Sequence, residues 1–74
     1  MKELVATNNL VTISFVEALL NEADIDYLIL DQNMSVLEGS IGIIPRRIMV
    51  GETVWYKASR LLEEAGLKQE ISAR

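Results

Sequence analysis

The chain has 74 residues, half of them hydrophobic, and carries 11 acidic against seven basic side chains for a net charge of −4. This length indicates one domain over residues 1–74, and the acidic balance argues against nucleic-acid binding, which needs a basic face. Cysteine and histidine are both absent, which excludes disulfides and removes the preferred zinc ligands and the commonest general base, so we expect no metal and no cofactor.

The first predicted elements are a strand over Lys2–Ala6 and a helix over Leu10–Ala23. The intervening Thr7-Asn8-Asn9 is typical of a helix start, where an Asn side chain caps free backbone N–H groups. The apolar residues that we expect this helix to bury against a sheet are Ile13, Val16, Leu20 and Ala23, widened by Phe15 and Leu19. No long apolar run precedes them, so we expect neither a signal peptide nor a membrane helix, and a cytoplasmic location by default.

Two strands are predicted in the middle of the chain. Asp24 should end the first helix, with Ile25 folding back onto it, and Tyr27–Asp31 then forms a strand that is apolar on both faces. The third strand is Arg46–Val50. Pro45 precedes it and has no N–H group to donate, which suits the beginning of a strand or a sheet edge.

The second helix is predicted to open at Gly51-Glu52-Thr53 and to run to Ala65. Its apolar stripe is Val54, Ala58, Leu61, Leu62 and Ala65, whereas Lys57, Arg60, Glu63 and Glu64 should face water. Gly66 suits a left-handed C-cap over which Leu67 closes. Two alternatives remain for the end of the chain: residues 67–71 form a short fourth strand, or residues 68–74 are a frayed tail.

The predicted order β-α-β-β-α, with or without a short fourth strand, defines the fold class. Both helices have one apolar face, so both should cover the same side of a small antiparallel sheet. A right-handed crossover followed by a hairpin gives the strand order 1-3-2. We therefore expect an α+β protein with the ferredoxin-like arrangement.

The run DQNMSVLEGSIGIIPRRIMV, from Asp31 to Val50, resembles a small family described as putative prokaryotic signal-transducing proteins. MKELVATNN, VEALLNEADI and ASRLLEEAGL are also similar, so the resemblance covers nearly the whole chain. It implies a fold like that of the nitrogen-regulatory PII proteins and a role in signalling. PII proteins bind adenine nucleotides and 2-oxoglutarate, but this sequence has no basic, glycine-rich phosphate cradle of the PII kind, so no functional residue is carried over.

The central segment Ser35–Ile44 is too apolar for an ordinary linker. Ser35 and Glu38 have the spacing of a capping box, and Gly39 and Gly42 allow tight turns, which predicts an ordered flap. Three interpretations stay open: the flap completes the core, presents an apolar interface, or closes over an anionic ligand. The candidate flap residues are Ser35, Val36, Leu37, Glu38, Gly39, Ser40, Ile41 and Gly42, together with Arg46 and Arg47.

Four further side chains have two interpretations each. Arg46 and Arg47 point to opposite faces of a strand, and one of them could pair with Asp31 or Glu38 or else bind an anion. In one interpretation Trp55 covers the rim of the core and Tyr56 is simply exposed. In the other, both residues belong to an interface.

No combination of nucleophile, acid and base stands out, so we expect no enzyme activity. The function that the sequence favours is a non-enzymatic regulatory interaction module, most simply a homodimer that pairs through the flap and an uncovered sheet edge. Another protein partner or a small-molecule effector is compatible with this function. The alternative is a sensor in which Arg46 or Arg47 holds an anionic or nucleotide-like ligand.

Overall fold

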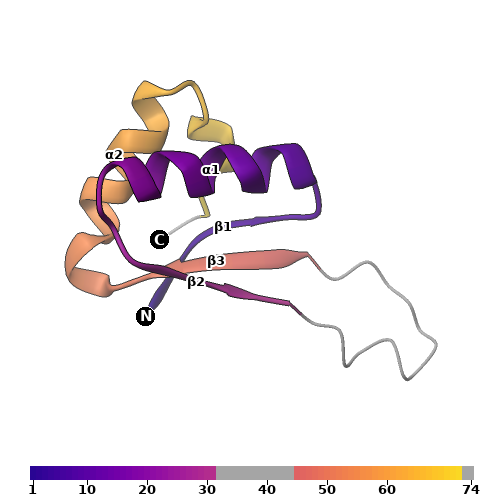
Figure 1. Cartoon of the computed structure of the whole chain (residues 1–74), viewed down its shortest axis with the longest axis horizontal. Coiled ribbons are helices and arrows are strands. Elements are labelled where there is room, and N and C mark those ends of the chain that lie inside the picture. Colours follow the sequence, from indigo (N-terminus) through magenta and orange to yellow (C-terminus); the bar gives the residue numbers. More distant parts are fainter. Residues whose placement is uncertain (32–44, 73–74) are drawn as a thin grey trace.

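The computed structural model describes residues 1–31 and 45–72 of the chain (Figure 1). Its elements are β1 (Lys2–Thr7), α1 (Leu10–Glu22), β2 (Tyr27–Leu30), β3 (Arg46–Val50) and α2 (Trp55–Glu64), with 3₁₀ turns at Glu52–Val54 and Lys68–Glu70. The strands form one antiparallel sheet in the order β1-β3-β2, and both helices lie on the same side of it. The predicted element order, strand order and ferredoxin-like α+β fold are confirmed.

Both ends of α1 are closed as the sequence predicts. The Oδ1 atom of Asn9 accepts hydrogen bonds from the backbone N–H groups of Val11 and Thr12, at 2.9 and 3.2 Å. At the other end Asp24 has a φ of 61°, a left-handed conformation that turns the chain back. The backbone N–H of Ile25 then donates to the carbonyl of Leu20 at 2.9 Å, and Ile25 is buried.

A β-bulge in β1 buries two consecutive side chains. In a regular strand neighbouring side chains point to opposite faces, yet Leu4 and Val5 are both fully buried. The pairing of β1 with β3 shifts register between Glu3 and Val5, which explains the exception. Donors from remote parts of the chain satisfy the carbonyls beside the bulge: the indole Nε1 of Trp55 donates to Glu3, and the backbone N–H of Ser72 donates to Leu4, both at 2.8 Å.

The second helix differs from the prediction at its beginning. A 3₁₀ turn over Glu52–Val54 comes first, and the α-helical turns start only at Trp55. Its end follows the prediction: Gly66 has a φ of 84°, and the N–H of Leu67 donates to the carbonyl of Leu62 at 2.9 Å. This is the glycine C-cap with its following apolar contact.

The end of the chain fits neither simple alternative as far as the structure describes it. Lys68–Glu70 forms a 3₁₀ turn, and Ile71 then makes a single bridge to Val5 on the outer side of β1. The backbone bond from Ser72 to Leu4 lies next to this bridge. One bridge therefore takes the place that a fourth strand beside β1 would occupy.

The core lies between the sheet and the two helices. Its buried apolar residues are Leu4, Val5, Ile13, Val16, Leu20, Ile25, Ile48, Val50, Trp55, Ala58 and Leu62. One predicted core residue is wrong: Phe15, expected to widen the buried stripe of α1, is 44% exposed. The reason is that two helices share a three-stranded sheet, so each helix has room to bury only a narrow stripe.

Candidate interaction surfaces

The predicted flap lies outside the described residues, so its three interpretations stay predictions. The flap residues concerned are Ser35, Val36, Leu37, Glu38, Gly39, Ser40, Ile41 and Gly42. The remaining predicted site residues, on β3 and α2, are all placed by the structure.

Both arginines of β3 lie beside carboxylates. Arg46 Nε lies 3.3 Å from Asp31 Oδ2, as one of the predicted pairings has it. Arg47 Nη1 lies 3.8 Å from Glu3 Oε1. The sequence did not indicate this partner, because it depends on the register of β1 against β3. All four side chains are between 32% and 42% exposed, so each pair contributes only about 0–1 kcal/mol.

Trp55 and Tyr56 are neighbours with opposite environments. Trp55 is 7% exposed, donates its indole N–H to the sheet and has Lys2 Nζ 4.4 Å from its ring centroid. Tyr56 is 68% exposed. Trp55 thus closes the rim of the core and Tyr56 faces water, and the interpretation that the pair belongs to an interface stays a prediction.

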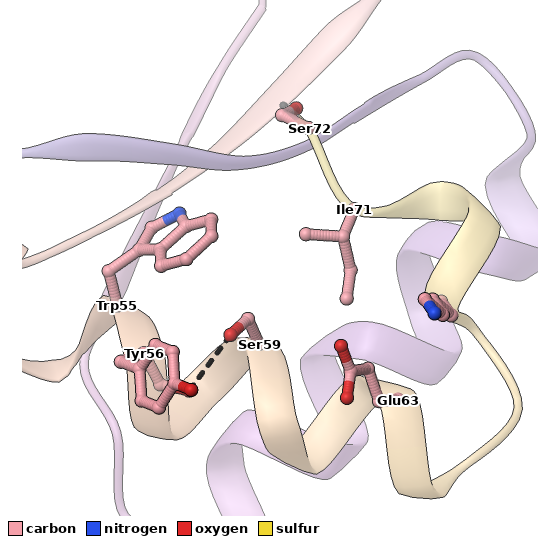
Figure 2. A pocket seen from close by; sticks show the side chains of 7 residues that line it. Trp55, Tyr56, Ser59, Glu63, Ile71 and Ser72 are labelled. Carbon is pink, nitrogen blue, oxygen red and sulfur yellow. Dashed lines mark hydrogen bonds between the residues drawn. The ribbon is translucent and has the colours of Figure 1, made fainter. Parts of the chain in front are cut away.

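A hollow of about 480 Å³ opens between α2 and the end of the chain (Figure 2). The indole ring of Trp55 and the side chain of Ile71 face each other across it, and Glu63 lies at its edge. The buried Ser59 beneath it already donates its hydroxyl to the carbonyl of Tyr56 at 2.8 Å. Its lining residues are Trp55, Tyr56, Ser59, Glu63, Lys68, Ile71 and Ser72. No buried side-chain nitrogen or oxygen of the described residues lacks a hydrogen-bond partner, so the hollow contains no buried polar group left to bind a ligand.

The sheet has one face without a helix. On β3, Ile48 and Val50 point to the helices and are buried, so Arg47 and Met49 point to the other face. Cross-strand partners share a face, which places further residues there. The residues of this uncovered face are Glu3, Ala6, Leu28, Leu30, Arg47 and Met49. Leu28 is 50% exposed, so apolar surface remains open at this face.

The two edges of the sheet are also unequal. Beside β1, Ile71 and Ser72 contribute a bridge and a backbone hydrogen bond. Beside β2, no strand from the described residues pairs on the side away from β3. The backbone of Tyr27–Leu30 thus has an edge to which another strand can add.

A second apolar surface, which the sequence analysis missed, lies on the side of α1 that faces away from the sheet. Leu10 is 62% exposed and Val11 77% exposed, and Phe15 and Ala18 are exposed as well. We call these four residues the α1 outer face. The sequence does carry a signal for it, because the helix LVTISFVEALLNE contains only two charged residues, Glu17 and Glu22.

Residues 1–31 and 45–72 contain neither a metal-binding cluster nor a membrane-spanning helix. No group of three or more acidic side chains is arranged to hold a metal ion. No helix in these ranges has both the length and the apolar character needed to cross a bilayer.

Comparison with known proteins shows the family. The model of a family described as putative prokaryotic signal transducing protein matches residues 1–66, which is most of the chain. This small α+β protein with a three-stranded antiparallel sheet therefore belongs to that family, as the resemblance of its central run indicated. None of the curated proteins with which the sequence was compared matches it.

Proposed function

We propose that the protein is a non-enzymatic interaction module of prokaryotic signal transduction that works as a homodimer. Membership of the signal-transducing family supports the general role. The observation that carries the homodimer is the combination on β2 of a half-exposed Leu28 and a backbone edge that no strand of residues 1–31 and 45–72 covers. Pairing of β2 with β2 of a second copy satisfies the edge and joins two sheets into one.

The sequence of β2 suits pairing with itself. In an antiparallel pair related by a two-fold axis, directly opposite residues lie on the same face, so Leu28 meets either Leu28 or Leu30 of the second copy. Both registers place leucine against leucine on the uncovered face. Tyr27 and Ile29 lie on the helix side in the same way, so the edge contains no charged residue within Tyr27–Leu30.

The homodimer is tested with an added charge at the edge. Leu28→Lys introduces the charge that natural edge strands use against pairing, and Tyr56→Lys adds the same charge on α2 as a matched control. Light scattering coupled to size exclusion should show a dimer for the wild type and the control, and a monomer for Leu28→Lys. A wild type that is still monomeric at about 100 μM, which is 100 times a micromolar dissociation constant, contradicts the homodimer. A Leu28→Lys variant that is still dimeric contradicts pairing through the β2 edge.

The alternative of an anionic-ligand sensor has less support, because both Arg46 and Arg47 already lie within 4 Å of a carboxylate. A thermal-shift screen against nucleotides, 2-oxo acids and other anionic metabolites separates the two functions. A ligand at 100 times its dissociation constant stabilises the fold by about 2.7 kcal/mol. A shift that Arg47→Ala abolishes would replace the interaction module by a sensor.

A further inference from the structure

The α1 outer face is one continuous stripe. Positions 11, 15 and 18 recur at helical spacing, so Val11, Phe15 and Ala18 follow one another along the side of α1 opposite its buried residues. Leu10 flanks the beginning of this row, about 100° round the helix from Val11, and the exposed polar Ser14 follows on the side of Leu10. Single exposed hydrophobic residues are ordinary, whereas a contiguous apolar stripe indicates a contact surface.

The second helix of the same protein shows what a solvated outer side looks like. On α2 four of the five exposed residues are charged, namely Lys57, Arg60, Glu63 and Glu64, and Tyr56 is the exception. The two helices pack on the same sheet, so their different outer sides do not follow from the fold. The α1 outer face has the composition of a helix side that another element covers.

The charges at the end of α1 are all acidic. Glu22, Asp24 and Asp26 are exposed, and we call these three residues the acidic turn. Neither of the two ion pairs formed among the described residues involves it, so no described Lys or Arg nitrogen lies within 4.0 Å of its carboxylates. Glu22 follows Ala18 at helical spacing on the same side of α1, and Asp24 and Asp26 come next in the turn, so one end of the apolar row is acidic and a partner can match this direction.

A second copy of the chain matches this surface poorly. Laid parallel, two α1 helices would bring the acidic turns against each other. Laid antiparallel, each acidic turn would meet the beginning of the other α1, where the N–H groups of Val11 and Thr12 are already bonded to Asn9. Neither arrangement gives the acids a base, since Leu10–Glu22 contains no Lys or Arg.

We propose that the α1 outer face binds an amphipathic helix of a partner protein, with an apolar stripe and with Lys or Arg residues at the end that meets the acidic turn. The length of α1, 13 residues, corresponds to about 20 Å, so a partner helix of about four turns covers it. Apolar side chains at positions i, i+3 or i+4 and i+7 of that helix contact the stripe. This surface is separate from the β2 edge, so the proposal goes beyond the homodimer and names what the module recognises.

The experiment uses the full chain and three synthetic peptides of equal length. The first is an amphipathic helix with lysines at one end, the second has glutamates in place of those lysines, and the third has the composition of the first in a scrambled order. Binding is measured by fluorescence anisotropy of the labelled peptide and located by amide NMR shifts. We expect the basic amphipathic peptide alone to bind, with shifts confined to α1 and the acidic turn, and the affinity to fall as salt is raised.

Three variants decide the location. Val11→Lys and Glu22→Lys should each lower the affinity for the basic peptide by at least about tenfold. The first interrupts the apolar stripe, and the second repels the lysines of the peptide. Tyr56→Lys adds the same charge on α2 and should leave the affinity unchanged. All three positions are exposed, and circular dichroism checks that each variant is folded.

Several results would overturn the proposal. They are absence of binding by all three peptides, equal binding by the acidic peptide, and full affinity of Val11→Lys. A wild-type dimer that Val11→Lys dissociates, while Leu28→Lys does not, would assign the face to a second copy instead. A loss of folding in Val11→Lys would show that the chain itself covers the stripe. A monomeric wild type that still binds the basic peptide refutes the homodimer and leaves this proposal standing.

Discussion

Replacement of Trp55 by Phe tests the contact that connects β1, α2 and the end of the chain. Trp55 Nε1 donates to the carbonyl of Glu3 at 2.8 Å, beside the bulge of β1. Phenylalanine keeps an aromatic ring in the core but has no N–H group to donate. The Glu3 carbonyl then loses a donor in a site that is partly buried, which costs about 1–3 kcal/mol.

The expected loss for Trp55→Phe is therefore about 2 kcal/mol in the free energy of unfolding. In a domain of this size each kcal/mol lowers the thermal midpoint by about 4–8 °C, so the midpoint should fall by about 8–16 °C. Far-UV circular dichroism is the right assay, because Trp55 is the chain's only tryptophan and its fluorescence disappears in the variant. Protein concentration is kept constant, since self-association raises apparent stability.

Two controls isolate the hydrogen bond. Tyr56→Phe changes the next residue, which is 68% exposed, and should shift stability by less than about 0.5 kcal/mol. Lys2→Met keeps an apolar side chain of similar length and removes the ammonium group over the Trp55 ring, which contributes about 0.5–1 kcal/mol at an exposed site. If Trp55→Phe unfolds within about 0.5 kcal/mol of the wild type, the indole bond does not stabilise the bulge and the reasoning is wrong.

Three further substitutions, two of them with a matched control, test the fold by urea unfolding. Leu20→Ala at a fully buried site should cost about 2–5 kcal/mol, whereas Val11→Ala at a 77% exposed site should cost less than about 0.5 kcal/mol; similar losses would contradict the assigned faces of α1. Asn9→Ala removes the side chain that caps α1 and should cost about 1 kcal/mol, and no loss would mean that the cap is unimportant. Gly66→Ala should cost about 1 kcal/mol because its φ is 84°, although no atom lies within 4 Å of the added methyl group. Gly51→Ala, at a φ of −64°, is the matched control and should be nearly neutral.

The sequence also predicted part of the candidate surfaces and missed the rest. It pointed to an uncovered sheet edge and to a pairing of Arg46 or Arg47 with Asp31 or Glu38, of which the structure shows Arg46 with Asp31, because strand order and hairpin neighbours follow from element order. It did not find the exposure of Phe15 or of Leu28. Both residues are apolar and sit in apolar runs, and an apolar run by itself does not say how much surface the neighbouring elements can cover.

What the sequence determined by itself is local. The Asn9 cap, the left-handed Gly66 and the periodic stripes of the two helices depend on residues within a few positions of one another, and they occur as predicted except that Phe15 is exposed. The order β-α-β-β-α then leaves few ways to arrange one small sheet with both helices on one side.

Only the tertiary structure decided the features that join distant residues. The bulge of β1 places the carbonyls of Glu3 and Leu4 where Trp55 and Ser72 reach them, although these partners lie more than 50 residues away in the chain. The narrow three-stranded sheet also decides that α1 buries one stripe and leaves the opposite apolar side exposed. Such contacts depend on register and on the surface available, and neither quantity can be read from the pattern of a single segment.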